Sequence, residues 1–391
     1  MADSTEEKVA SGASGSTVST RIPDEESQSA ATQRRGATLY AMPSPFPEGW
    51  YFIATRKAVE KAKLIQKTWM GENVLIWCDN KGRICVSESY CPHLGADMGP
   101  EGGGCIRDGR LLCPFHGYEF DATGQCVATP FAPAPKTAKL RVYETQEING
   151  LIFAWWGTGG RASHWSLPTE TLELEGWGNS QITTLRFAGH PQETTENVVD
   201  LAHLRYVHGY DNVTSGLELA VDGPYLEAHF DFKRVRKIVK VANLTFECSA
   251  RAHIFGLGYS FVEVREQSIG MDLRLWVLAT PVDGKLIDLT LVSQVKEIHK
   301  PKRLFAGLGF LPTGMRAPIM NRFIASQQRD DVLQDVVIWS RKQYKSRPRL
   351  CRSDGKIMPF RAYCAQFYAC LLYTSDAADE EECRSRWSPY H

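Results

Sequence analysis

The sequence predicts an α+β protein with two domains, each built mainly from antiparallel strands. The chain of 391 residues is long enough for two domains of ordinary size. Short strand-like segments separated by Gly and Asp/Asn turns fill the first half, whereas longer strands followed by one long helix fill the second half. Hydrophobic residues make up 43% of the chain, which is enough for a core in each domain.

The composition excludes several classes of protein. Lysine plus arginine and aspartate plus glutamate both number 45, and this balance argues against a nucleic-acid-binding protein. The sequence contains no apolar run of about 18 residues that could span a membrane, and its start lacks the pattern of a secretory signal. We therefore expect a cytoplasmic protein whose 11 cysteines are thiols or metal ligands rather than disulfides.

The first domain is expected at residues 46–158, after a disordered tail at 1–45 that is rich in Ser, Thr, Ala, Glu and Gly. Its expected strands are 50–54, 73–77, 83–87, 111–113, 118–120 and 151–156. A glycine-rich stretch at 157–160 is expected to be the linker to the second domain.

The second domain is expected at residues 159–369. Its Asp-Gly pair at 283–284 predicts a hairpin, and its last helix is expected to pack across the sheet. The expected elements are helices at about 192–208 and 317–344 and strands at 225–236, 239–252, 259–266, 273–280 and 286–295. Residues 370–391 break the pattern and are expected to be a tail, possibly extraneous to the natural protein.

Two short motifs in the first domain each pair a cysteine with a histidine. They read Cys-Pro-His at 91–93 and Cys-Pro-Phe-His at 113–116, and a glycine follows each one closely. A Rieske [2Fe–2S] cluster needs this set, because two thiolates bind one iron and two imidazoles bind the other. Zinc accepts the same donors, but zinc fingers usually group the cysteines in one pair and the histidines in another. We predict that Cys91, His93, Cys113 and His116 hold a Rieske cluster, with zinc as the alternative.

The segments 91–99 and 113–120 closely resemble the cluster loops of Rieske non-haem iron oxygenases. Respiratory Rieske proteins carry an extra cysteine in each loop, and Ala96 and Phe115 stand there in this chain, so the resemblance points to a low-potential cluster. A glycine-rich insertion at 99–104 lengthens the turn between the loops and is expected to leave the site intact. Tyr118 is expected either to hydrogen-bond near the cluster or simply to pack. The family implies an antiparallel β Rieske domain followed by a helix-grip (START-like) catalytic domain.

A second motif reads Asp-x-x-His-x-x-x-x-His at 200–208. Asp200 and His203 share a face of the expected helix. His203 and His208 are five residues apart, about 140° around an ideal helix, so joint ligation requires a π-type turn or a helix end near His208. The motif resembles the iron-binding signature of Rieske oxygenases, which implies that His203 and His208 bind a mononuclear Fe(II). The resemblance also implies that Asp200 bridges to a cluster histidine of a neighbouring subunit, and hence a homotrimer.

The third iron ligand is expected from the long C-terminal helix. Such iron sites combine two histidines with one carboxylate, and the candidates are Asp330, Asp331 and Asp335. The helical neighbours of Asp330 and Asp331 are mostly polar, so both are expected to be solvated. Asp335 lies on an apolar row of the helix, where a carboxylate needs a partner or a metal, and its segment resembles the ligand-bearing segment of steroid-ring hydroxylases.

Segments near the C-terminus resemble two related groups, the bacterial 3-ketosteroid 9α-hydroxylase oxygenase components and the cholesterol 7-desaturases. The resemblance covers roughly residues 46–368 and implies an apolar pocket for a sterol-like substrate. It implies a terminal oxygenase that activates O2 and hydroxylates or desaturates this substrate. No dinucleotide fingerprint follows a strand, so a separate NAD(P)H-dependent reductase or ferredoxin is the expected electron donor.

Three other functions remain open from the sequence. The first is an oxygenase or demethylase of an aromatic or other small substrate. The second is a Rieske electron carrier without oxygenase activity, and the third is a lipid-binding module with a degenerate metal site. The second motif at 200–208 and the size of the second domain favour the oxygenase over the last two.

Overall fold

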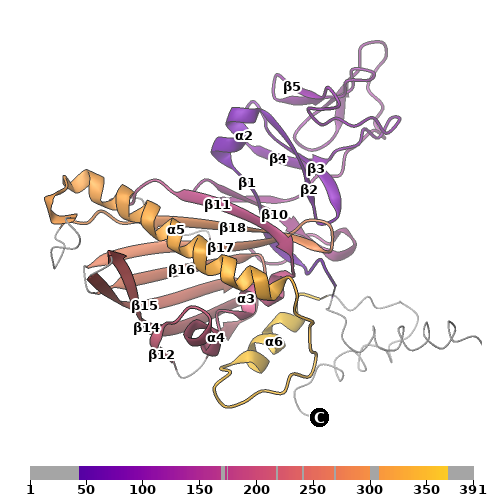
Figure 1. Cartoon of the computed structure of the whole chain (residues 1–391). Coiled ribbons are helices and arrows are strands. Elements are labelled where there is room, and N and C mark those ends of the chain that lie inside the picture. The colour runs from indigo at the N-terminus through magenta and orange to yellow at the C-terminus, as the bar shows by residue number, and fades with distance from the viewer. Residues whose placement is uncertain are drawn as a thin grey trace, which may run out of the picture. The chain divides into compact units, whose positions relative to one another are not determined.

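The computed structural model describes residues 44–168, 172–173, 175–216, 219–239, 242–267, 270–299 and 308–368 (Figure 1). The tails expected at 1–45 and 370–391 lie outside the described residues, apart from Ser44 and Pro45. All strand pairs in the described sheets are antiparallel, and a few helices accompany them, which confirms the α+β prediction.

The N-terminal region contains three small sheets, with strand orders β1-β10-β9, β2-β3-β4 and β5-β6-β7-β8. The strands are β1 (Gly49–Thr55), β2 (Leu64–Trp69), β3 (Glu72–Cys78), β4 (Ile84–Glu88), β5 (Cys105–Arg107), β6 (Arg110–Leu112), β7 (Glu119–Phe120), β8 (Cys126–Ala128), β9 (Thr145–Ile148) and β10 (Leu151–Trp156). Helix α2 (Arg56–Ala62) follows β1, and a 3-10 turn, η1 (Thr158–Gly160), lies in the expected linker. The six strands expected from the sequence are present, but α2 and the strands β2, β5, β8 and β9 were not foreseen.

Strand β1 connects two hydrophobic cores because its alternate side chains point to opposite faces. Trp50 and Phe52 pack into a core that also contains Tyr259 and Trp276 of the second sheet. Tyr51 and Ile53 pack into the core of the N-terminal region. Six of the seven residues of β1 are therefore buried.

The C-terminal region folds around an eight-stranded antiparallel sheet with the order β11-β18-β17-β16-β15-β14-β12, in which β13 also pairs with β14. The strands are β11 (Gln181–Ala188), β12 (Asp211–Ser215), β13 (Ala220–Asp222), β14 (Tyr225–Val239), β15 (Ala242–Phe255), β16 (Tyr259–Glu266), β17 (Met271–Pro281) and β18 (Leu286–Val295). The helices are α3 (Pro191–Glu196), α4 (Leu201–Tyr206), η2 (Leu308–Phe310), α5 (Thr313–Trp339) and α6 (Ile357–Ala365).

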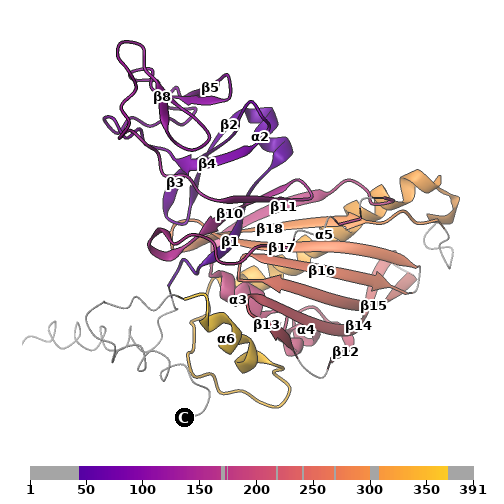
Figure 2. The same ribbon diagram turned by 180° about the vertical axis from the view of Figure 1, so that it is seen from behind.

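Helix α5 lies across one face of this sheet, as both views show (Figures 1 and 2). Its last residue, Trp339, stacks on Phe187 of β11 with ring centroids 5.7 Å apart. The helix ends there rather than at residue 344 as expected, and Trp339 is the last of its buried residues. The expected hairpin is confirmed, because the Asp283 carboxylate accepts hydrogen bonds from the backbone of Lys285 and Leu286 in the turn between β17 and β18.

The expectation of one helix at about 192–208 is wrong. The segment forms two short helices, α3 and α4, separated by residues 197–200. Asp200 precedes α4 as its N-cap, and its carboxylate accepts a hydrogen bond from the His203 N–H at 3.2 Å. An aspartate that bonds the backbone in this way favours a new helix start over a continued helix.

Candidate metal centres

The two Cys-His loops have the same backbone hydrogen bonds. The N–H of Cys91 donates to the carbonyl of Ala96, and the N–H of Cys113 donates to that of Tyr118, both at 2.8 Å. The carbonyl of each cysteine also accepts a bond from a glycine four residues later, and both glycines, Gly95 and Gly117, have positive φ. A residue with a side chain is strained in that conformation, so the glycines permit the tight turn. The two loops therefore have the same local backbone conformation.

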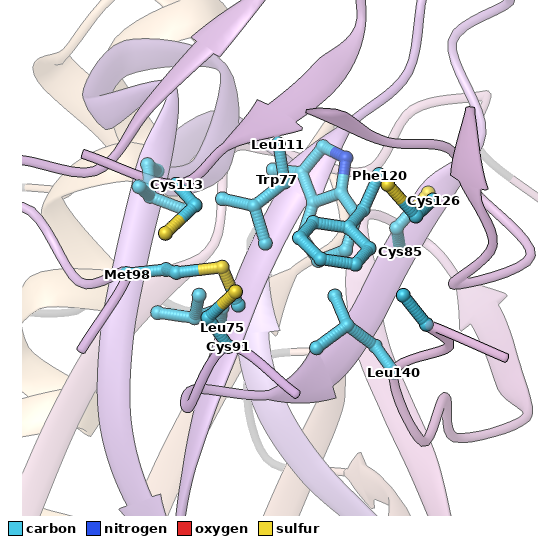
Figure 3. Packing of buried hydrophobic residues seen from close by; sticks show 12 residues of the cluster. Leu75, Trp77, Cys85, Cys91, Met98, Leu111, Cys113, Phe120, Cys126 and Leu140 are labelled. Atoms are coloured by element: carbon cyan, nitrogen blue, oxygen red, sulfur yellow. The ribbon is translucent and has the colours of Figure 1, made fainter. Parts of the chain in front are cut away.

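The loops bring two thiols together in the core and two imidazoles near the surface. Cys91 and Cys113 lie in the same buried cluster, with Met98 and Leu111 beside them (Figure 3). Burial raises the pKa of the Cys91 thiol to about 12, and the neighbouring Cys113 adds to this effect. The ring centroids of His93 and His116 are 4.7 Å apart. Two thiols and two imidazoles are the donor set of a Rieske cluster. Without a metal the buried thiols stay protonated, and iron would take the place of these protons.

Tyr118 packs on the imidazole of His93. The two rings are stacked, with centroids 4.6 Å apart and planes 10° from parallel. Of the two roles expected for Tyr118, the structure shows packing, against a histidine that is expected at the cluster. The glycine-rich insertion at 99–104 folds back closely on the first loop, since a Cβ on Gly104 would lie 1.8 Å from the Met98 carbonyl oxygen.

The structure brings His203, His208 and Asp335 together. One potential ligand atom from each lies within 4.8 Å of the others. The His208 Nε2 is 3.3 Å from an Asp335 carboxylate oxygen, and the two imidazole centroids are 5.2 Å apart. Two imidazoles and one carboxylate form a donor set that suits non-haem Fe(II). Of the His, Cys, Asp and Glu side chains in the described residues, these three form the group whose potential ligand atoms all lie this close together.

Both histidines use the same ring nitrogen for support. The Nδ1–H of His203 donates to the Asp200 backbone carbonyl, and that of His208 donates to the Gln334 side-chain oxygen at 3.4 Å. Because Nδ1 makes these bonds, Nε2 is the nitrogen of each ring that would bind a metal. Burial lowers the pKa of His203, which keeps its ring neutral. For His208 burial acts in the same direction, but the hydrogen bond and charge of Asp335 outweigh it and the pKa is raised.

The helix end, and not a π-type turn, brings the two histidines together. Helix α4 ends at Tyr206, so His208 lies beyond it, and Gly209 follows with φ 64°. The spacing predicted that Asp200 shares a helix face with His203, and this prediction is wrong. Asp200 instead caps the helix that carries His203. Its carboxylate is about one-third exposed and lies beside the His203 imidazole.

The C-terminal helix offers Asp335, and the structure corrects the expectation for Asp331. Asp330 is exposed, as expected. Asp331 is only 8% exposed, and its carboxylate pairs with the Arg234 guanidinium and accepts a hydrogen bond from the Tyr210 hydroxyl at 3.3 Å. Its polar helical neighbours predicted solvation, but contacts from β14 and the segment after α4 could not be read from helix spacing.

Several supporting residues were missed in the sequence. The Asn197 amide donates to the Asp335 carboxylate at 3.2 Å, and Gln334 supports His208. Asn197 lies three residues before the motif at 200–208, so its position was a usable signal. Gln334 gave no signal, because only the folded chain brings it to His208.

A cavity lies between the second sheet and helix α5. Its volume is about 130 Å³, and it is open to solvent on one side. Its walls are mainly apolar and include Phe232, Phe246, Leu273 and Phe323. Tyr210, Arg234 and Asp331 form a polar part of the wall. Asp331 is one helical turn from Asp335 and Tyr210 is two residues from His208, so this part of the wall adjoins the His203, His208 and Asp335 group.

Known proteins match this chain in both regions. The family model of the Rieske [2Fe-2S] domain matches residues 49–144, and that of the 3-ketosteroid 9α-hydroxylase C-terminal domain matches residues 154–368. Cholesterol 7-desaturase nvd 2 of Ciona intestinalis is 30% identical over 86% of this chain and 75% of its own length. A 3-ketosteroid-9-alpha-monooxygenase oxygenase component of Rhodococcus rhodochrous is 26% identical over 84% of this chain and 85% of its own length.

Solved structures share the fold at lower identity. Dicamba monooxygenase bound to dicamba is 17% identical, with a TM-score of 0.62 over 82% of this chain and 96% of its own. NdmA of Pseudomonas putida CBB5 with caffeine is 16% identical, with a TM-score of 0.59 over 81% of this chain and 91% of its own. Since the C-terminal model alone matches more than half of the 391 residues and a Rieske model precedes it, the chain belongs to the Rieske oxygenases of the 3-ketosteroid 9α-hydroxylase type.

Proposed function

We propose that this chain is the terminal oxygenase component of a system that hydroxylates or desaturates a steroid- or sterol-like substrate. As a Rieske oxygenase it uses O2 and takes electrons from a reductase or ferredoxin. The observation that carries the choice of substrate is the mainly apolar cavity whose wall adjoins the His203, His208 and Asp335 group. Similar proteins are named for cholesterol and a 3-ketosteroid, and such ligands need an apolar cavity.

We assign Cys91, His93, Cys113 and His116 to a [2Fe–2S] cluster and His203, His208 and Asp335 to a mononuclear Fe(II). When bound, the cluster supplies single electrons and the mononuclear iron supplies O2 activation. The chain itself holds the imidazoles in the correct tautomer through Asp200 and Gln334, and orients Asp335 through Asn197.

We further propose that the chain works as a homotrimer in the cytoplasm, with Asp200 linking the cluster of one subunit to the iron of the next. Large apolar side chains are exposed at both ends of this route. Leu94 and Phe115, beside the cluster histidines, are 67% and 61% exposed, and Tyr206 in α4 is 93% exposed. These side chains are available to pack against a neighbouring subunit. None of the described helices is both long and apolar enough to cross a membrane.

Metal analysis of a single variant tests the assignment. Replacing Asp335 with Ala removes one of three ligands, so iron should fall from about three to about two per chain and turnover should be lost. The visible spectrum of the cluster should be unchanged. Asp330→Ala is the matched control, because that carboxylate lies on the same helix but is exposed, and it should keep both iron and activity. Loss of the cluster spectrum in the Asp335 variant would refute the assignment.

Oxygen uptake with a foreign reductase tests the substrate class. Cholesterol, a 3-ketosteroid and a panel of aromatic acids would be compared with the same preparation. Substrate-dependent uptake with product formation is expected only with the steroids. Turnover of aromatic acids alone would favour the second candidate, an oxygenase or demethylase of small aromatic substrates.

A further inference from the structure

Tyr210 lies between the apolar cavity and the residues assigned to the mononuclear iron. On one side its ring centroid is 5.7 Å from that of His208, and on the other side the ring stacks on Phe232 at 4.7 Å. Tyr210 and Phe232 line the cavity. His203, His208 and Asp335, which are all described, do not line the cavity. The Tyr210 ring is thus part of the wall at the end of the cavity nearest the proposed metal.

The Tyr210 side chain is held in this position by charged groups. Its hydroxyl accepts a hydrogen bond from the Arg234 guanidinium at 3.0 Å and donates one to Asp331 at 3.3 Å. Arg234 also pairs with Asp331 and lies over the Tyr210 ring, 4.8 Å from its centroid. Buried charge-assisted bonds are among the stronger ones, so the ring is fixed by strand β14 and helix α5 together.

We propose that Tyr210 is the specificity-determining residue of this site: its ring sets how far an apolar substrate advances towards the metal. This inference rests on the proposed function for the metal but not on the identity of the substrate. A rigid wall at the reacting end decides which carbon of a bound molecule comes within reach. Arg234 and Asp331 act through Tyr210 as positioning residues.

The test compares Tyr210→Ala, which removes the ring, with Tyr210→Phe, which keeps the ring but loses both hydroxyl hydrogen bonds. Phe323→Ala is the matched control, because Phe323 also lines the cavity but lies 12 residues before Asp335 on α5, about 18 Å along the helix. Fluorobenzene serves as a small apolar probe, and its ¹⁹F relaxation is measured with the mononuclear site filled by Fe(II). Relaxation that depends on this metal is isolated by subtracting the value for Asp335→Ala.

Removing the ring should increase the metal-dependent relaxation of fluorobenzene, because the probe comes closer to the metal. The Phe variant and the Phe323 control should match the wild type. With a steroid that the wild type oxidises, the Ala variant should also change the ratio of products by about tenfold, while the Phe variant keeps that ratio. Iron content should stay at the wild-type level in all variants.

Unchanged relaxation in Tyr210→Ala would overturn the proposal, as would loss of the mononuclear iron, which would show a structural role instead. Equal effects of Ala and Phe would also overturn it, because the hydroxyl and not the ring would then be decisive. If the wild type oxidises no steroid, the substrate class proposed above fails, but the relaxation measurement still decides the role of Tyr210.

Discussion

At the scale of single residues, hydrogen bonds fix the ring orientation and tautomer of several histidines in this chain. His203 and His208 show this in the proposed second metal site, and His190 shows it outside that site. The His190 Nε2–H donates to the Ser44 carbonyl at 3.1 Å, while its Nδ1 accepts a bond from the Gln192 N–H at the start of α3. Only the neutral ring can make both bonds.

His190 should make the chain sensitive to acid. Burial lowers its pKa from 6.5 to about 4, against a smaller opposing effect of the Ser44 carbonyl. As the pH falls below 6.5 the unfolded chain takes up a proton here and the folded chain does not, so the stability present above this pH is progressively lost down to about pH 4. At pH 5 the loss from this residue is about 2 kcal/mol.

The variant His190→Asn tests this expectation, since asparagine keeps a cap acceptor for the Gln192 N–H but does not titrate. Urea unfolding at pH 7 and pH 5 should show a smaller loss of stability in the variant than in the wild type, by about 2 kcal/mol. Equal losses in the two proteins would mean that His190 has no part in the acid sensitivity.

At the scale of elements, residues 197–200 are as important for the second site as the helices that flank them. The break between α3 and α4 makes Asp200 a cap, and the end of α4 brings His208 to His203. The loop before α6 packs on this break. Gly355 has φ 75°, and a Cβ there would lie 2.3 Å from the Val199 carbonyl oxygen. Glycine is therefore required by both conformation and space.

Gly355→Ala should displace the break and weaken the second metal site. We expect a loss of about 2–4 kcal/mol in unfolding free energy and a lower content of mononuclear iron, because strain and a backbone clash combine. The cluster spectrum should not change. Gly314→Ala is the matched control, since a Cβ there meets nothing within 4 Å and the residue is in helix α5, so stability should change by no more than about 1 kcal/mol. Full iron in Gly355→Ala would contradict this account.

The sequence predicted elements with strong local patterns and missed those defined by partners. The strands Tyr259–Glu266 and Leu286–Val295 were located to the residue, because their apolar runs are bounded by clear turns. Strands β12 and β13 have mostly exposed side chains and α6 is short, so none of them gave a pattern. Of the two proposed metal sites, the spacing of the Cys-His motifs and the position of Asp335 on an apolar helix face could be recognised in the sequence. The burial of Asp331 was not, because Arg234 and Tyr210 reach it only through tertiary contacts.

At the scale of the whole molecule, the two regions share a hydrophobic core around β1. The proposed electron route, in contrast, runs from one chain to another. The Phe52 carbonyl accepts a hydrogen bond from Thr280 of β17 at 2.9 Å, next to the aromatic core that β1 shares with the second sheet. At the surface, the exposed His93, which we assign to the cluster, and the partly exposed Asp200 carboxylate are the groups proposed to meet across subunits. If so, the two metal sites that work together belong to different chains.

Mixed trimers test this arrangement. One variant, Asp335→Ala, lacks the mononuclear site but keeps the cluster, and the other, Cys113→Ser, lacks the cluster but keeps the mononuclear site. Each alone should be inactive. In a head-to-tail ring formed by co-expression at equal levels, half of the chains have an intact mononuclear site and half of these face an intact cluster, so about a quarter of the wild-type activity per chain should return.

Two further results make this measurement decisive. Adding Asp200→Asn to the Cys113→Ser subunit should slow the recovered turnover while iron stays bound, because the carboxylate that accepts the bridging hydrogen bond is gone. Mixing the two variants after separate purification, under conditions in which trimers do not exchange subunits, should restore nothing. Mixed trimers without activity, despite both metals being present, would place electron transfer within one chain and remove the bridging role of Asp200.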